Sequence, residues 1–261
     1  MKTSTTWLAY YQANRDALLT IPWSLGPELT AEERAVASSI QEFQVGESSE
    51  GHHLIRDAKE YSARTGDADY SACMALFIAE EQRHARDLGR FLNLHGIGLV
   101  KTTACDQVFR ALRNAFPGLE LSIAVLITAE IIAKVYYAAL QAATGSRILR
   151  RLCEQILRDE EAHVAFQGGQ LLELRSGRGA VTRLATMLLQ KILFCGAVLV
   201  VWSRHRPVMQ RAGTGFRDWW RACWQEFGLA FAPRSTLSVF SADLGAHNSP
   251  APSLQPAASN P

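Results

Sequence analysis

Apolar residues recur at spacings of three and four along most of the chain, a pattern typical of amphipathic α-helices and not of strands. This pattern is continuous over residues 68–95, 118–143 and 147–175. A capping box, Thr30-Ala-Glu-Glu33, opens one further helix, which we predict to run without a break to Arg64. The sequence therefore predicts an all-α protein built around four long helices.

Shorter helical patterns flank these four helices. We predict a helix at residues 5–19, a short helix from Asp106 to Phe116, an apolar helix from Val181 to Arg206 and a last helix from Phe216 to Phe231. Pro207 is expected to end or kink the apolar helix. The predicted organisation is an N-terminal helix with an irregular segment (1–30), a four-helix bundle (31–175), a helical extension (180–232) and a disordered tail (241–261).

The apolar helix after the bundle invites comparison with a membrane span. Its centre, from Ile192 to Trp202, is an uninterrupted apolar run of 11 residues. A span needs about 20 apolar residues, so we expect no membrane span. The remaining interpretations are a buried fifth helix and a contact in a homodimer formed through the C-terminal helices.

Two of the long helices carry the motif Glu-x-x-His at positions that the pattern assigns to the core. These are Glu81-x-x-His84, between Phe77 and Leu88, and Glu160-x-x-His163, between Ile156 and Leu171. Residues i and i+3 share a helix face, so each motif presents a carboxylate and an imidazole in one direction. Burying such groups is costly without compensation, and a bound cation provides it.

The two motifs are related by an internal repeat. The turns Thr65-Gly-Asp and Thr144-Gly-Ser are 79 residues apart, and the same interval separates Glu81 from Glu160. The chain thus reads as a duplicated helical hairpin. Glu130, on the apolar face of 118–143, maps back to position 51, which favours Glu50 as the fourth carboxylate. Glu47 lies one turn away on the same face and remains an alternative, as a carboxylate lining a cavity or a metal entry path.

On these motifs the region 31–175 resembles the ferritin-like di-iron carboxylate superfamily, which includes rubrerythrins, bacterioferritins, the ribonucleotide reductase small subunit and bacterial multicomponent monooxygenases. The resemblance implies a four-helix bundle of two hairpins joined by a long crossover, with additional C-terminal helices. It also implies that Glu80 and Asp159 accept the imidazole N–H of a ligand histidine on a neighbouring helix. The metal ligands that it implies here are Glu50, Glu81, His84, Glu130, Glu160 and His163.

Three further residues near these ligands have two interpretations each. Tyr137 is on the face of Glu130, where it is either a core tyrosine or a hydrogen-bonding or radical partner of the metal site. Gly46 and Gly51 flank the carboxylates of the first long helix. They either leave room near the metals or allow close packing of helices.

Composition limits the partners and the cellular location that we expect. Among 261 residues the net charge is +2, which gives no reason to expect nucleic acid as a partner. The five cysteines are scattered without a Cys-x-x-Cys pair, and the N-terminus has no signal-peptide core, so we expect a cytoplasmic protein with reduced thiols. This cysteine pattern also argues against the rubredoxin-type iron module of typical rubrerythrins.

The first functional hypothesis is an oxidoreductase with two iron ions, with manganese or a mixed pair as other possibilities. It would use O2 or peroxide and a small-molecule substrate, together with an electron donor that the sequence does not identify. The second is an iron-handling protein with ferroxidase, storage or detoxification activity. The third is a helical interaction protein whose site is vestigial.

Overall fold

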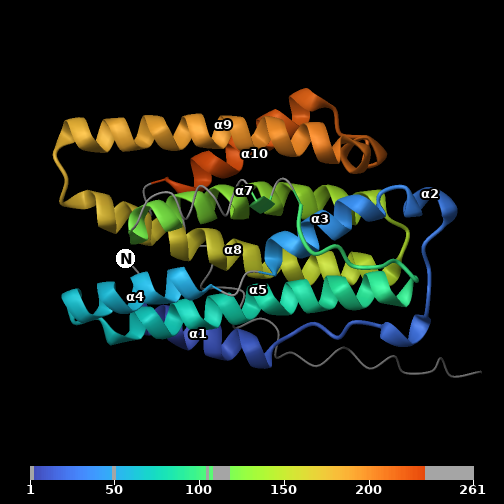
Figure 1. The fold of residues 1–261 in the computed structure, drawn as a ribbon, viewed down its shortest axis with the longest axis horizontal. Coiled ribbons are helices and arrows are strands. Elements are labelled where there is room, and N and C mark those ends of the chain that lie inside the picture. Colours follow the sequence, from blue (N-terminus) through green and yellow to red (C-terminus); the bar gives the residue numbers. More distant parts are fainter. Residues whose placement is uncertain (1–2, 49–50, 104–105, 108–117, 233–261) are drawn as a thin grey trace, which may run out of the picture. The chain divides into compact units, whose positions relative to one another are not determined.

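The computed structural model describes residues 3–48, 51–103, 106–107 and 118–232, and every regular element in these ranges is helical (Figure 1). The all-α prediction is therefore confirmed for this part of the chain. Most of the predicted short helix Asp106–Phe116, and the whole predicted tail 241–261, lie outside the described residues. The elements are α1 (Ser4–Asp16), the 3-10 turn η1 (Trp23–Leu25), α2 (Ala31–Arg34), α3 (Ala37–Glu47), α4 (His52–Thr65), α5 (Ala68–Leu94), α7 (Leu119–Ala143), α8 (Arg147–Ser176), α9 (Ala180–Arg211) and α10 (Phe216–Ala230).

Two helical hairpins form the centre of the compact unit Met1–Phe231. In the first, α3 and α4 pack against α5, and in the second, α7 packs along α8. The hairpins meet where α5 contacts α8 and α4 contacts α7. Helices α5 and α7 run in the same direction, and α8 runs opposite to both (Figure 1). Outside these hairpins, α1 covers α5, while α9 and α10 cover α7.

Side-chain caps fix where the long helices begin. Glu33 and Thr30 form the predicted capping box, with each side chain accepting from the other residue's backbone N–H at 2.9 and 3.2 Å. Asp67 caps α5 by accepting from the N–H of Tyr70, and Ser146 caps α8 by accepting from the N–H of Leu149. The predicted capping box is therefore confirmed. Glu33 also accepts from the turn between α7 and α8, which ties the start of the first hairpin to the second.

The prediction of one uninterrupted helix from Thr30 to Arg64 is wrong. The described residues of that segment form the separate helices α2, α3 and α4, with α3 ending at Glu47 and α4 beginning at His52. Gly51 has φ +66°, a left-handed conformation that glycine adopts without the strain imposed on other residues. A Cβ on Gly51 would lie 2.5 Å from Cδ1 of Ile78 on α5. Gly51 thus allows close helix packing at the break, one of the two roles considered for it.

The core is continuous through the helices and contains aromatic as well as aliphatic side chains. Tyr70, Phe77 and Phe91 of α5, and Tyr136 and Tyr137 of α7, are almost completely buried. The cysteines in the described part of the chain, Cys73, Cys153, Cys195 and Cys223, are free thiols, as the sequence predicted for these four. The centre of the bundle is therefore apolar except where specific polar residues enter it.

Helix α9 differs from the prediction in both length and environment. It has 32 residues and continues through Pro207 to Arg211, so it does not end at the proline. By length and apolarity alone, α7 and α9 could each cross a membrane. Within the apolar 18-residue stretch of each helix, 72% of the residues are buried in α7 but only 28% in α9. Val181, Leu184, Leu189 and Ile192 are at least 60% exposed, so α9 is not the buried fifth helix that was one expectation.

Candidate metal centre

Six carboxylate and imidazole side chains converge in the middle of the two hairpins. They form two overlapping groups, each with its ligand atoms within 4.8 Å of one another. Glu81 and Glu160 belong to both groups, whereas each group has its own histidine and its own additional glutamate. The first group is Glu47, Glu81, His84 and Glu160, and the second is Glu81, Glu130, Glu160 and His163.

The two histidines direct the same ring nitrogen toward this cluster. His163 Nδ1 lies 3.0 Å from Glu81 Oε1 and 3.7 Å from Glu160 Oε2. His84 Nδ1 lies 3.6 Å from Glu81 Oε1 and 3.7 Å from Glu160 Oε1. Glu81 and Glu160 therefore lie between the two imidazoles. The other two glutamates are the outer members of the cluster. Glu47 Oε2 lies 3.9 Å from His84 Nδ1, and Glu130 Oε2 lies 3.8 Å from His163 Nδ1.

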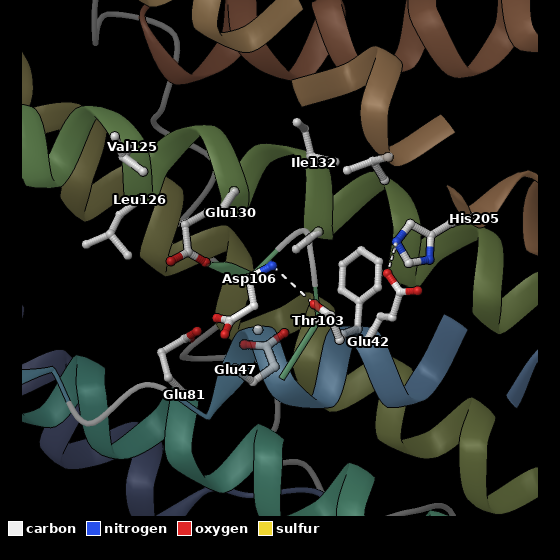
Figure 2. Close-up of a pocket in the computed structure, with 15 residues that line it drawn as sticks. Glu42, Glu47, Glu81, Thr103, Asp106, Val125, Leu126, Glu130, Ile132 and His205 are labelled. Carbon is white, nitrogen blue, oxygen red and sulfur yellow. Dashed lines mark hydrogen bonds and ion pairs between the residues drawn. The ribbon is translucent and has the colours of Figure 1, made fainter. Parts of the chain in front are cut away.

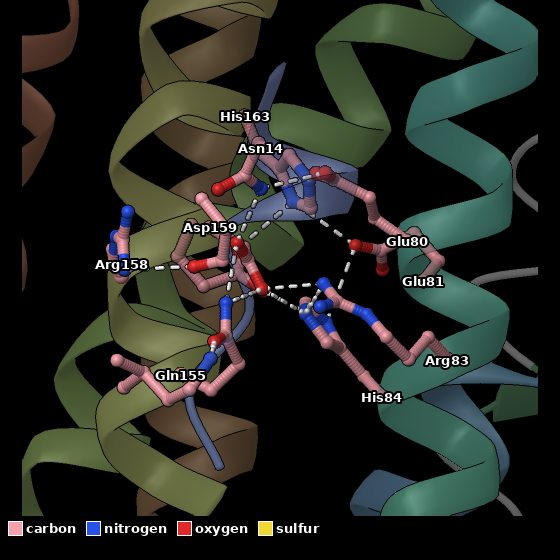
Figure 3. A network of polar contacts seen from close by, with 12 residues as sticks. Asn14, Glu80, Glu81, Arg83, His84, Gln155, Arg158, Asp159 and His163 are labelled. Atoms are coloured by element: carbon pink, nitrogen blue, oxygen red, sulfur yellow. Dashed lines mark hydrogen bonds and ion pairs between the residues drawn. The ribbon is translucent and has the colours of Figure 1, made fainter. Parts of the chain in front are cut away.

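The opposite ring nitrogens contact carboxylates on the other helix (Figure 3). His84 Nε2 of α5 is 3.0 Å from Asp159 Oδ2 of α8, and His163 Nε2 of α8 is 2.9 Å from Glu80 Oε2 of α5. These are the two contacts that the resemblance implied. Because a carboxylate only accepts, both Nε2 atoms carry a proton, so Nδ1 is the nitrogen of each ring that remains to bind a metal ion.

Sequence reasoning missed the residues that hold Glu80 and Asp159 in place. The amide of Asn14, from α1, donates to Glu80 Oε1 at 2.7 Å and to Asp159 Oδ1 at 2.8 Å, and thus joins the two (Figure 3). Arg83 and Gln155 also donate to Asp159, at 2.6 and 3.0 Å. Asn14 follows Trp7 and Tyr11 at helical spacing on the buried face of α1, and a polar residue on that face was the available signal.

The outer glutamates of the cluster each accept one hydrogen bond. The Tyr137 hydroxyl donates to Glu47 Oε1 at 2.6 Å, and the Gln167 amide donates to Glu130 Oε1 at 3.2 Å. Burial and the negative charge of Glu47 raise the pKa of Tyr137 well above its ordinary value, so the hydroxyl keeps its proton. Tyr137 is therefore a hydrogen-bonding partner of this cluster, and it is also a buried core residue.

Glu47 occupies a position in the cluster that the repeat had assigned to Glu50. Glu50 itself lies outside the described residues. The repeat placed Glu50 there only if one helix continued to the turn at Thr65, whereas α3 ends at Glu47 and α4 begins at His52. The other five predicted ligands, Glu81, His84, Glu130, Glu160 and His163, are all brought together.

The inner face of the cluster is buried and lacks hydrogen-bond partners. Among the described residues, His84 Nδ1, His163 Nδ1, Glu81 Oε1 and both carboxylate oxygens of Glu160 have no such partner. Glu160 and His163 are completely buried. Unpartnered buried polar atoms are rare and each costs about 1–3 kcal/mol. Here they all face one another, which is the arrangement of ligand atoms around cations.

Like charges in this space perturb protonation strongly. Burial, followed by repulsion from Glu130, raises the pKa of Glu81 and of Glu160 well above the ordinary glutamate value. Burial would lower the pKa of His163, but the surrounding carboxylates outweigh it and raise that pKa well above normal. Four carboxylates at this depth thus need added positive charge, supplied either by protons or by metal ions.

A cavity of about 140 Å³ adjoins the cluster on one side (Figure 2). It lies among α3, α7 and α9, and its lining includes Glu47, Glu81 and Glu130. The remaining lining is mostly apolar, with Glu42 and His205 at the end away from Glu81 (Figure 2). The cavity therefore connects the cluster to a space that could receive a small molecule.

Comparison of the chain with family models, with curated proteins and with solved structures found no match.

Proposed function

We propose that this chain is a ferritin-like carboxylate protein that binds two metal ions. Glu81 and Glu160, which belong to both groups, would help to hold both ions, together with His84 and Glu47 for one ion and His163 and Glu130 for the other. The observation that carries this proposal is the orientation of the histidines. Each Nδ1 atom faces the carboxylates without a hydrogen-bond partner, while each Nε2 is held by a carboxylate of the opposite helix.

Charge and ligand chemistry both support this stoichiometry. Four glutamates and two neutral imidazoles contribute about four negative charges, which two divalent ions neutralise. Oxygen and imidazole ligands suit iron or manganese, and no cysteine belongs to either ligand group among the described residues. The order of helices supports the ferritin-like assignment, since one glutamate comes from each of α3 and α7 and Glu-x-x-His from each of α5 and α8.

We infer that the reaction is an oxidation driven by O2 or peroxide, with iron as the first choice of metal. A pair of ferrous ions, when bound, supplies two electrons to an oxidant at one place. The residues of the chain bind and orient those ions: Asp159 and Glu80 fix the histidine tautomers, and Tyr137 fixes Glu47. The apolar cavity beside the ligands favours an enzyme with an organic substrate over a site that handles iron alone.

The test is an anaerobic titration of the metal-free protein with ferrous iron, followed by exposure to O2 and Mössbauer spectroscopy. We expect about two iron ions per chain in one coupled pair, as the ligand count implies. Glu160→Ala should lose the pair. Glu161→Ala is the matched control, because Glu161 is the next residue of α8 but is partly exposed and pairs with Lys134. A stoichiometry of zero or one in folded wild-type protein contradicts the proposal.

A ferroxidase is the second candidate, and one observation favours it. Asp106 and Glu42 line the cavity together with the three ligand glutamates, and such an acidic path attracts cations. A ferroxidase should oxidise many ferrous ions per chain without any organic substrate. An oxidoreductase should stop after about one turnover of its iron pair until substrate and reductant are supplied, and oxygen consumption distinguishes the two.

A further inference from the structure

The cavity beside the metal centre has an inner end and an outer end of different chemistry. Glu47, Glu81 and Glu130 form the inner end, and each comes from a different helix, α3, α5 and α7 (Figure 2). All three belong to the proposed ligand groups. A molecule in the cavity therefore lies directly against the side of the centre that these carboxylates form.

The walls between the two ends are mostly apolar, with Thr103 and Asp106 as polar members (Figure 2). Successive turns of α7 contribute Leu126, Ala129 and Ala133, and Phe43 of α3 and Val201 of α9 add further apolar surface. The distance from Leu126 to Ala133, seven residues further on, is about 10 Å along the helix axis. An apolar cavity of comparable volume, about 150 Å³, accommodates benzene. The space thus suits a molecule of about the size of one aromatic ring.

Gly46 keeps part of this space open. It is a helical residue of α3 that lines the cavity next to Glu47, and a Cβ built on it meets nothing within 4 Å. Glycine inside a helix is less stable than alanine by about 1 kcal/mol, so it is unfavourable unless space is needed. Of the two roles considered for Gly46, the contacts favour leaving room and not close packing. A larger side chain here would enter the cavity.

The charges of the lining disfavour anions. The residues that line the cavity include five carboxylates, Glu42, Glu47, Glu81, Asp106 and Glu130, and no lysine or arginine among those described. Burial lowers the pKa of His205 to about 4, so its ring is neutral at physiological pH. Glu42 is already engaged by Arg204 through two hydrogen bonds of 2.8 and 2.9 Å. No group of this lining is therefore available to balance a carboxylate or phosphate on a ligand.

We propose that this cavity is the substrate pocket and that it binds a neutral, mainly apolar organic molecule of about the size of a monocyclic arene. The identification as a substrate pocket rests on the proposed function, but binding of such a molecule does not require metal. Binding and metal content can therefore be measured separately, and either can fail without the other.

The test uses toluene and benzoate, which have similar rings but differ in charge. Binding of each to the purified full chain is measured by ligand-observed NMR, without metal and after loading with iron under anaerobic conditions. We expect toluene to bind both forms and benzoate to leave the metal-free form unoccupied. Preferential binding of benzoate to the metal-free protein, or no binding of toluene to either form, would overturn the proposal.

Variants locate the binding. Gly46→Leu and Ala129→Leu fill the cavity from opposite walls, and each should weaken toluene binding at least about tenfold while leaving two metals bound. Gly228→Leu is the matched control, because Gly228 is also helical with open space around its Cβ but does not line the cavity. Circular dichroism establishes that each variant is folded. Undiminished toluene binding in both folded cavity variants contradicts the assignment, whereas loss of metal in the wild type contradicts only the proposed function.

Discussion

Two histidines define the candidate centre at the level of single residues. Each ring is fixed by a contact of 2.9 or 3.0 Å from Nε2 to a carboxylate, so its Nδ1 is presented to the glutamates without rotational freedom. Such contacts raise ligand basicity and usually affect metal affinity by about 10–100-fold. Glu80 and Asp159 therefore affect the candidate centre, although neither belongs to a ligand group.

We predict that His84→Ala and His163→Ala each lose one metal ion and most of the stabilisation that metal provides. A ligand at 100 times its Kd stabilises the native state by about 2.7 kcal/mol, so the thermal midpoint of the loaded protein should fall. The metal-free variants should change much less, because each substitution also relieves a crowded polar core. Differential scanning calorimetry with and without metal measures both effects. Equal destabilisation in the two forms would mean that the histidines are structural.

Glu47 and Glu50 give the second prediction. Glu47→Ala should abolish the paired site, whereas Glu50→Ala should leave two metals bound. Glu47 belongs to one of the two ligand groups and is held there by Tyr137, so it already supplies the carboxylate that the repeat assigned to Glu50. Elemental analysis after metal loading gives the stoichiometry of each variant. Retention of both ions in Glu47→Ala, with loss in Glu50→Ala, would restore the assignment that the repeat favoured.

The sequence was sufficient to predict five of the six residues that the structure brings together. Glu81, His84, Glu130, Glu160 and His163 lie on uninterrupted helices, where spacing alone sets the face. Spacing could not separate Glu47 from Glu50 reliably, because both fall on one face of the continuous helix that the pattern predicted. The choice depends on where the helix stops, and that is set by contacts with another helix.

At the scale of elements, the break between α3 and α4 has a clear physical cause. Gly51 combines a left-handed backbone with a position so close to Ile78 that no Cβ fits without movement. The amphipathic pattern continues across the break, since Ile40, Val45 and Leu54 are all buried. Periodicity therefore predicted the buried face correctly but not the interruption, which depends on backbone conformation and on the approach of α5.

We predict opposite effects of alanine at the two glycines of this region. Gly51→Ala should lower the free energy of unfolding by about 1–3 kcal/mol, through backbone strain and the contact with Ile78. Gly46→Ala should raise it by up to about 1 kcal/mol, because its surroundings are open and its backbone is helical. Urea unfolding of the metal-free protein measures both. A stabilising Gly51→Ala would show that this position does not require a left-handed conformation.

The contact of α9 with α3 should make stability depend on pH. His205 is buried against Ser39, Glu42 and Tyr136, with Arg204 beside it, and burial lowers its pKa from 6.5 to about 4. Between pH 4 and pH 6.5 the unfolded state therefore binds more protons at His205 than the folded state does. The contribution of neutral His205 to the free energy of unfolding is complete above pH 6.5 and is lost as the pH falls toward 4. The slope is at most about 1.4 kcal/mol per pH unit. His205→Gln should reduce this slope, which urea unfolding at several pH values measures. An unchanged slope would mean that His205 is not the group responsible.

At the scale of the whole molecule, α9 presents an apolar face that nothing in the described part of the chain covers. Val181, Leu184, Leu188 and Ile192 follow one another at helical spacing and are 58–83% exposed. Contiguous exposed apolar surface of this kind usually marks an interaction site. The sequence showed that α9 is apolar, but it could not show what α9 packs against, because that depends on the arrangement of all the other helices.

Homodimerisation through this face is the fifth prediction. Leu188→Glu together with Ile192→Glu should shift sedimentation from dimer to monomer, because charges there cannot be buried against a second copy. Gln210→Glu, on the exposed part of α9 near its end, is the matched control and should leave the dimer intact. A wild-type protein that is monomeric at all concentrations would exclude this interface.

The connection made by Asn14 has a consequence for the order in which the protein folds. Asn14 bonds to Glu80, which is 66 positions away in the sequence, and to Asp159, which is 145 positions away. Contacts between such distant positions form late, because the loss of chain entropy precedes the gain from each contact. Glu81 and Glu160, the two members common to both groups, also come from separate hairpins, so a nascent chain that has released only the first hairpin has half of the six side chains and lacks Asp159. Under the proposed function, metal uptake follows synthesis and docking of α8, and an ion that arrives earlier meets only α1 and the first hairpin.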